Sequence, residues 1–181
     1  MDEIVKAALA KWPNVPHCYH WLALDARGDW YMRDDRIQAA GPFPHPKGSR
    51  VLHDKLQEFI GRNYEADESG CWFFQNGPQR VYVELEAAPW VWRLQGPPGT
   101  APAVTSHTGR PAAFRQAWLD ENGRLFLACD LGFGLVHTLD TAIAAEAIEA
   151  GQWALEELQF AQMPARFGYV LSPGAARQPK H

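Results

Sequence analysis

The side chains best suited to metal binding are histidines and cysteines, and one group of them is close together in the chain. His17, Cys18 and His20 fall within four consecutive residues. A structural zinc site needs about four ligands in tetrahedral reach, and Cys71 and Cys129 stand alone in the sequence. On an extended strand, Cys18 and His20 would share one face while His17 would point away. We therefore predict ordinary core and edge residues here, and no metal.

A second group could support nucleophilic catalysis. Cys129 and Asp130 end an apolar run, and His137 follows seven residues further on. A cysteine becomes a nucleophile when a neighbouring base or positive charge lowers its pKa. An enzyme of unknown class is therefore one alternative, and it requires these three side chains to meet around a cleft. The competing interpretation is that Cys129 is a buried structural residue.

Aromatic side chains give the feature that points beyond an ordinary domain. The chain has eight tryptophans in 181 residues, and rings of this size dominate the burial of apolar surface. Residues 81–86 and 90–94 alternate as strands do, yet Phe73, Tyr82 and Val91 fall opposite the buried set. Both faces of a sheet over 71–94 therefore need cover, from the other half of the chain, another subunit or a ligand.

The leading hypothesis is a non-enzymatic ligand-binding or regulatory protein. A cleft between two halves, lined by aromatic and polar side chains, would suit a small molecule, because pockets favour such interfaces. No cofactor is predicted. A third alternative is a structural module that binds another protein, with an exposed apolar patch and homodimers in solution. The candidate ligand-binding residues are Tyr31, Arg33, Arg80, Tyr82, Glu84 and Arg93.

Charge and hydropathy exclude several classes of partner. Seventeen basic and twenty-one acidic residues give a net charge of −4, with no basic stripe to follow a nucleic-acid backbone. No apolar stretch approaches the ~20 residues that span a bilayer, and the N-terminus places acidic residues first, unlike a signal peptide. Three widely spaced cysteines suit a reducing compartment. We predict a cytoplasmic protein that binds neither nucleic acid nor membrane.

The first 94 residues are predicted to form an α+β half. The expected elements are a helix over 2–11, a hairpin of strands 19–24 and 29–33, and a loop over 41–48. Ser49 is expected to cap a helix that ends at Gly61, because residues 51–60 carry an apolar stripe and glycine suits a left-handed cap. A second hairpin over 63–74 and the strands over 81–86 and 90–94 complete this half.

A stretch rich in proline and glycine separates this half from the rest. Residues 95–113 contain four prolines and three glycines, so they are predicted to be a linker or long loop. Gly96-Pro97-Pro98-Gly99 resembles the start of a phosphate-binding loop, but the required lysine does not follow. A C-terminal α+β half is expected over 114–172. Its elements are a hairpin over 114–129, a strand over 135–138, a helix from Asp140 to Gly151, an ambiguous segment over 153–160, a strand over 167–171 and a disordered tail over 173–181.

An acidic turn closed by glycine occurs three times. Residues 24–30, 66–72 and 119–125 each contain Asp-x-x-Gly followed two places later by a large apolar residue. Two explanations stay open, a repeated α+β module and the general preference of hairpins for these turn residues. Together these patterns predict an α+β fold in which repeated hairpin and helix motifs form antiparallel sheets in two packed halves.

Several of these motifs occur in one order that is typical of a known family. Gly28-Asp29-Trp30, then a helix, then the strand pair that begins with residues 81–90 (VYVELEAAPW) resembles a bacterial family, domain of unknown function 1285. The resemblance covers roughly residues 18–94 and extends weakly over 114–172. The 95–113 insertion and the alanine-rich C-terminal third depart from the pattern, as in a sister family. The resemblance implies repeated α+β motifs and a role in ligand sensing or signal transduction, and it supplies no catalytic residue.

Overall fold

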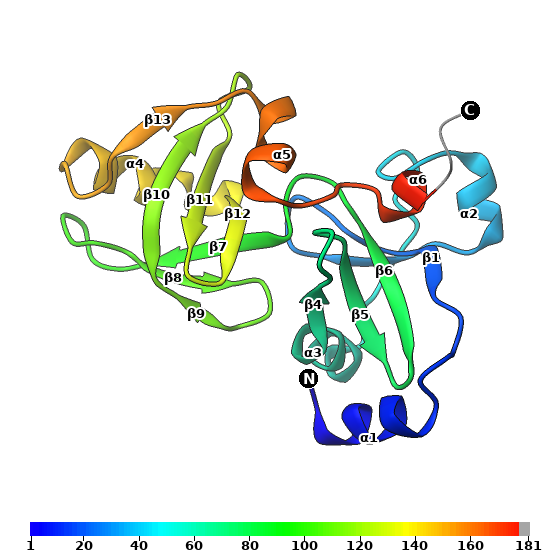
Figure 1. Ribbon diagram of the computed structural model, residues 1–181. Coiled ribbons are helices and arrows are strands. Elements are labelled where there is room, and N and C mark those ends of the chain that lie inside the picture. The colour runs from blue at the N-terminus through cyan, green and yellow to red at the C-terminus, as the bar shows by residue number, and fades with distance from the viewer. Residues whose placement is uncertain (178–181) are drawn as a thin grey trace. The chain divides into compact units, whose positions relative to one another are not determined.

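The computed structural model describes residues 1–177 and divides the chain into two compact units (Figure 1). Unit 1 combines Met1–Asp25, Asp29–Glu86 and the described residues from Gly168 onward, while unit 2 combines Ala26–Gly28 and Ala87–Phe167. Each unit mixes helices with a sheet, so the predicted α+β class is confirmed. No helix in the described part of the chain has both the length and the apolar character that a membrane crossing requires.

Unit 1 is built on a six-stranded sheet. In chain order it comprises α1 (Glu3–Lys11), β1 (Cys18–Leu24), β2 (Trp30–Met32), α2 (Asp35–Ala40), β3 (Ser49–Arg50), α3 (Asp54–Arg62), β4 (Tyr64–Ala66), β5 (Trp72–Asn76), β6 (Gln79–Leu85) and α6 (Pro173–Arg177). The strand order is β3-β2-β1-β6-β5-β4. All neighbours are antiparallel except β1 and β6, which run parallel. The predicted hairpins β1-β2 and β4-β5 are therefore confirmed.

Unit 2 is built on a seven-stranded sheet. Its elements are β7 (Trp90–Gln95), β8 (Ala103–Ser106), β9 (Pro111–Ala112), β10 (Phe114–Leu119), β11 (Leu125–Cys129), β12 (Gly132–Val136), η1 (Thr138–Asp140), α4 (Thr141–Glu149), β13 (Leu155–Glu157), η2 (Phe160–Gln162) and α5 (Met163–Phe167). The strand order is β13-β10-β11-β12-β7-β8-β9. The predicted hairpin β10-β11 is confirmed, and parallel pairing joins β12 to β7 and β13 to β10.

The three Asp-x-x-Gly segments form the same turn. In each, one aspartate oxygen accepts the backbone N–H four residues later, at 2.9 Å for Asp25, 3.0 Å for Asp67 and 2.7 Å for Asp120. Each closing glycine has φ between +74° and +83°, a conformation that side chains with a Cβ rarely adopt. The local resemblance seen in sequence is therefore a real structural repeat of the turn, made by aspartate and glycine together.

The second predicted helix begins later and ends later than expected. Ser49 pairs with Met32 as part of the edge strand β3, and α3 starts at Asp54 behind His53. Gly61 lies inside α3 and Asn63 is the residue at its C-terminal end. The structural reason is that the segment after the loop first completes the sheet next to β2. The apolar stripe was correctly recognised, but only its second half is helical.

Four further predictions differ from the structure. Residues 95–113 contain the strands β8 and β9 in place of a linker, and the main segment of unit 2 begins at Ala87 instead of after residue 113. Residues 167–171 form no strand: α5 ends at Phe167, and the chain continues to α6 over residues 173–177 that were predicted to be disordered. The remainder of that tail, residues 178–181, lies outside the described residues.

The sheet predicted over 71–94 is two sheets. Strands β5 and β6 belong to unit 1, whereas β7 belongs to unit 2, and the ladder breaks in the bend before Trp90. Pro89 has no backbone N–H to donate in that bend. Both faces of these strands are covered as expected: Tyr82 and Val83 are both buried in β6, and Val91 is buried in β7.

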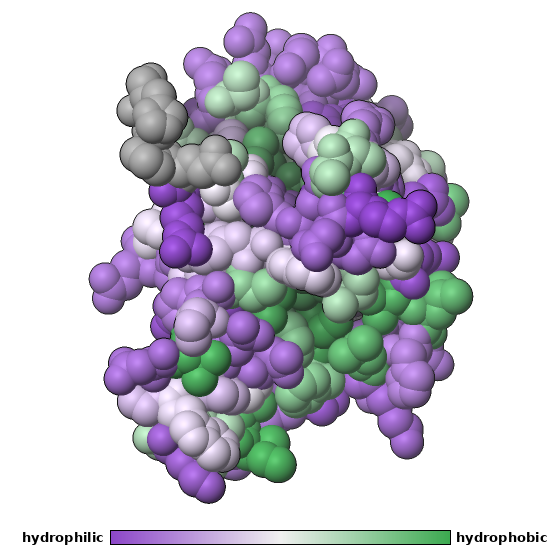
Figure 2. Space-filling model, turned by 90° about the vertical axis from the view of Figure 1, so that its right-hand side faces the viewer, coloured by the Kyte–Doolittle hydropathy of each residue, from purple (hydrophilic) through white to green (hydrophobic). Residues whose placement is uncertain are grey.

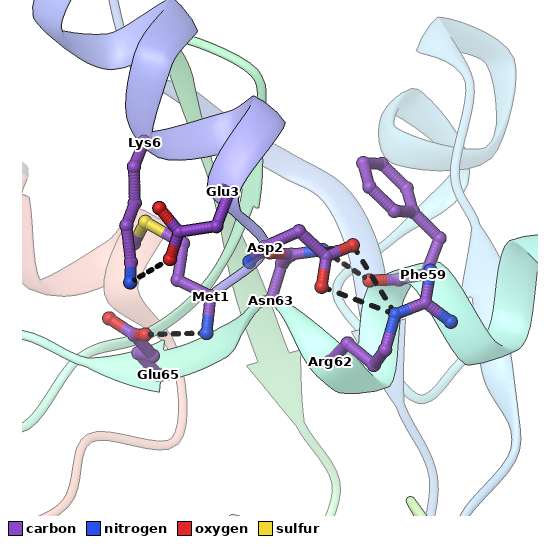
Figure 3. A network of polar contacts seen from close by, with 8 residues as sticks. All are labelled: Met1, Asp2, Glu3, Lys6, Phe59, Arg62, Asn63 and Glu65. Atoms are coloured by element: carbon purple, nitrogen blue, oxygen red, sulfur yellow. Dashed lines mark hydrogen bonds and ion pairs between the residues drawn. The ribbon is translucent and has the colours of Figure 1, made fainter.

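The start of the chain is fixed to the end of α3 by a polar network (Figure 3). The backbone N–H of Asp2 donates to the Asn63 side chain at 2.7 Å, and Asn63 donates to the Phe59 carbonyl at 2.9 Å. Arg62 pairs with the Asp2 carboxylate at 3.3 Å, and the amino group of Met1 lies 3.6 Å from Glu65. Asn63 is fully buried, so this network holds α1 against α3 within unit 1.

Candidate ligand-binding site

Unit 1 contains a cavity of about 600 Å³. We name it the Arg33 cavity. Its wall is formed by His20 of β1, by the segment from Arg33 through the loop after α2, by residues 84–86 at the end of β6, and by residues 171–175. Four segments that are distant in sequence therefore meet around one volume.

Arg33 supplies a buried positive charge to this wall. The residue is only 1% exposed, and its Nη2 donates to the carbonyls of Gly41 at 2.7 Å and Pro46 at 3.2 Å. Burial lowers the pKa of Arg33 and Glu84 raises it, yet a guanidinium stays protonated at any ordinary pH. The buried Nε has no hydrogen-bond partner. Arg33 thus holds the loop after α2 and keeps part of its donor capacity unused.

Glu84 supplies the opposite charge. This β6 residue is 4% exposed, and its Oε1 accepts the backbone N–H of Gly174 at 3.2 Å and lies 3.3 Å from Nδ1 of His20. Its Oε2 makes neither contact. The carboxylate therefore joins three segments, β1, β6 and the start of α6, through a single oxygen atom.

His20 reaches Glu84 from a strained backbone conformation. Its φ is +68°, and among residues 1–177 it is the only residue other than glycine with a positive φ. It lies where the pairing of β1 with β6 shifts register, between Cys18 and Leu22. A Cβ placed on Gly174 would collide with the His20 imidazole. Strain of this kind persists only where the surrounding contacts enforce it, and here those contacts are Glu84 and α6.

A second ion-paired group borders the cavity. Nζ of Lys47 lies 2.9 Å from Asp25 and 3.2 Å from Glu86, which is itself part of the wall. Burial acts to lower the pKa of Lys47, but hydrogen bonds to Asp25 and Glu86 outweigh it and raise the pKa. Lys47 therefore stays charged and compensates the Glu86 carboxylate.

Of the six residues predicted to bind a ligand, the structure brings two together. Arg33 and Glu84 both line the Arg33 cavity. Tyr82 lines a different hollow of unit 1, of about 330 Å³, where its ring stacks on Tyr19 and its hydroxyl donates to Asp67 at 2.9 Å. The predicted cleft between two halves stays a prediction, because the Arg33 cavity lies wholly within unit 1.

The other three predicted residues lie elsewhere. Tyr31 has the Lys47 amine 5.6 Å from its ring centre, and Arg80 lies over the ring of Phe73. Arg93 belongs to β7 of unit 2, where it pairs with Asp140 at 2.6 Å.

Sequence reasoning missed the wall residues that come from the chain's end. His20 was noticed only as a metal-like residue, Leu171 fell in a segment predicted to be a strand, and Ala175 fell in the tail predicted to be disordered. The available signal was Gly168 and Gly174 flanking a short apolar run, which suggests a segment that packs closely against another backbone.

The catalytic alternative built on Cys129, Asp130 and His137 is wrong. Cys129 pairs with Gly132 at one end of the β11-β12 hairpin, whereas His137 follows the far end of β12, about 16 Å along a strand that rises ~3.3 Å per residue. Burial is the main cause that raises the pKa of Cys129 to about 12, and Asp130 instead accepts the N–H of Ala113 at 2.7 Å. A thiol that is 4% exposed with this pKa is not a nucleophile.

No group of three or more potential metal ligands is found within residues 1–177. The His17, Cys18 and His20 segment instead packs against neighbouring side chains. The ring of His17 meets the ring of Tyr82 edge-on, and burial raises the pKa of the Cys18 thiol.

The molecular surface combines polar and apolar areas. The face drawn in Figure 2 shows hydrophobic surface gathered across its middle and toward its right side, bordered by hydrophilic residues. Large hydrophobic side chains exposed in unit 1 are Ile4, Trp12, Trp21, Met32, Leu52 and Leu56.

A family model described as "Protein of unknown function (DUF2946)" matches residues 1–174. The chain belongs to this family. No curated protein matches the chain. Among solved structures, the crystal structure of a DUF1285 family protein from Shewanella baltica OS155 is similar, with 16% identity, a TM-score of 0.47, and coverage of 70% of this chain and 91% of that one.

Proposed function

We propose that this DUF2946-family protein is a non-enzymatic binding protein whose Arg33 cavity takes a small organic ligand through a carboxylate. The observation that carries the proposal is a guanidinium that is almost wholly buried in a cavity wall and keeps Nε without a partner. Leaving a buried donor unsatisfied costs about 1–3 kcal/mol, and a carboxylate at the guanidinium would offset that cost. The volume of about 600 Å³ lies in the range of small-molecule sites.

A regulatory role follows from how the chain's end is attached. Residues 171–175 contribute to the cavity wall, and three backbone donors join this segment to unit 1: Val170 to the Gly70 carbonyl, Leu85 to the Leu171 carbonyl, and Gly174 to Glu84. A ligand that touches this wall would change the stability of the segment's attachment. Binding would therefore be coupled to the position of α6, which supports the predicted role in sensing or signal transduction.

Calorimetric titration with a panel of small monocarboxylates tests the proposal. We expect saturable binding to the wild-type protein. Ala175 is exposed and lines the cavity, so Ala175→Trp should abolish binding by occupying the space. Ala176→Trp adds the same side chain to the next position of α6, away from this wall, and should bind as wild type. If no carboxylate binds, or if both variants bind like wild type, the proposal is wrong.

Two sequence predictions accompany this proposal. Self-association as a homodimer is measured by light scattering on the purified chain, where a monomer mass at all concentrations would exclude it. The cytoplasm is the predicted location, on the spacing of the three cysteines, and it is checked by fractionation of the producing cells.

A further inference from the structure

The Arg33 cavity presents two opposite charges, and each has unused hydrogen-bonding capacity. Both side-chain hydrogen bonds of Arg33 come from Nη2, and Nε has no partner. Both contacts given above for Glu84 use Oε1, and Oε2 takes part in neither. A guanidinium pairs best with a carboxylate, and a carboxylate pairs best with an ammonium or guanidinium group. One cavity therefore has a place for an anion and a place for a cation.

The balance of charge disfavours a ligand with a net negative charge. Apart from His20, the charged side chains of the wall are Arg33, Glu84 and Glu86. Lys47 is shared by Asp25 at 2.9 Å and Glu86 at 3.2 Å, so it adds no excess positive charge to the wall, and Arg33 and Glu84 remain as a pair of opposite charges. A phosphate or dicarboxylate would meet two carboxylates for one guanidinium. A ligand of zero net charge that carries both signs matches the wall.

The remainder of the wall is apolar. Phe43, Pro44, Leu85 and Leu171 line the same volume as the two charged groups. Burial of an apolar group contributes about 25 cal/mol per Å² of surface removed from water. The site thus offers a hydrophobic region beside the charge pair.

From these observations we infer that the ligand is an α-amino acid with an apolar side chain, its carboxylate on the Arg33 guanidinium and its ammonium on Oε2 of Glu84. The inference rests on the proposed function and names the chemical class of the ligand. An amino acid is the smallest common molecule that carries a carboxylate, an ammonium and an apolar group on one carbon atom.

Matched ligands test the role of the ammonium without any substitution. Calorimetric titrations of the wild-type protein would compare L-phenylalanine with 3-phenylpropionate and N-acetyl-L-phenylalanine, and L-leucine with 4-methylpentanoate. We expect the free amino acids to bind roughly 10-fold or more tightly than their partners, because a charge-assisted hydrogen bond to Glu84 is lost in each partner. Equal affinities would overturn the inference while leaving carboxylate binding, and hence the proposed function, intact.

A substitution at Glu84 tests the assigned partner. Glu84→Gln keeps an oxygen that can accept the Gly174 N–H and removes the negative charge. We expect it to bring the ratio of amino-acid to des-amino affinity close to one, with 3-phenylpropionate binding at least as tightly as to the wild type, because the repulsion from the Glu84 carboxylate is removed. An unchanged ratio would show that Glu84 does not bind the ammonium group. If phenethylamine binds as tightly as phenylalanine, Arg33 does not bind the carboxylate. If none of these ligands binds, both the proposed function and the inferred ligand class are wrong.

Discussion

Two arginine–carboxylate sets lie in the two units, and they differ in how completely their hydrogen bonds are used. In unit 2, Asp140 accepts from Nε of Arg93 at 2.6 Å, from its Nη2 at 3.2 Å and from the buried N–H of Leu94 at 3.0 Å. In unit 1, Arg33 and Glu84 share a cavity wall, Nε of Arg33 has no hydrogen-bond partner, and both contacts given above for Glu84 fall on Oε1. The first set uses both oxygens of the carboxylate, whereas the second is incomplete and borders a cavity.

This difference separates a structural set of charges from a candidate binding site. Side chains of the same types carry out both tasks, so residue type alone does not distinguish them. When every donor and acceptor is already paired, a ligand can form no further hydrogen bond with the set. Unused donors and acceptors around a cavity can form hydrogen bonds with a ligand and so contribute to its affinity. The comparison predicts that changes at Asp140 affect stability and that changes at Glu84 affect binding.

The largest expected effect is that of Asp140→Ala on stability. The side chain of Asp140 is 7% exposed, and its removal leaves the buried N–H of Leu94 without an acceptor. We expect the free energy of unfolding to fall by about 2–3 kcal/mol, measured by urea denaturation followed by tryptophan fluorescence. Asp140→Asn, which keeps one carbonyl oxygen, should lose less. An unchanged urea midpoint for Asp140→Ala would show that the complete set is not structural.

Low pH should weaken the stabilisation that Asp140 gains from Arg93 and Leu94. Burial alone would raise the pKa of Asp140, but hydrogen bonds from Arg93 and Leu94 outweigh it and lower the pKa below its ordinary value of 3.8. A carboxylate with a lowered pKa in the folded state stabilises above its unfolded pKa, and that contribution is lost as pH falls through the folded pKa. The stability difference between wild type and Asp140→Asn should therefore be full near pH 7 and shrink below pH 3.8.

The measurement is a series of urea midpoints for both proteins between neutral and strongly acidic pH. Asp67 acts in the same direction in unit 1, because hydrogen bonds from Ser69, Cys71 and Tyr82 outweigh its burial and lower its pKa. It is present in both proteins and cancels in the difference. A difference that stays constant down to the lowest pH would contradict the assignment to Asp140.

The sequence was informative where local chemistry decides the structure and much less so where distant segments meet. The Asp-x-x-Gly turns and the hairpins were correct because an aspartate acceptor and a left-handed glycine act within five residues. The strands β8 and β9 were missed because the pairing of β8 with β7 and of β9 with β8 outweighs the proline and glycine content of residues 95–113. The same limit applies to the site. Arg33 and Glu84 were selected for their polarity beside aromatic residues, but the contact of Glu84 with Gly174 spans 90 residues, and no local pattern reveals it.

The smallest expected effect on stability is that of Glu84→Gln, and it gives the sharpest form of the comparison. Glutamine still offers an oxygen to the Gly174 N–H, and losing a buried charge removes a desolvation cost as well as an attraction to Arg33. We expect the free energy of unfolding to change by less than about 1 kcal/mol, against about 2–3 kcal/mol for Asp140→Ala. The same urea experiment measures both. If Glu84→Gln lowered the free energy of unfolding as much as Asp140→Ala, the unit 1 set would also be structural. Its main role would then be to hold α6 in place and not to bind a ligand.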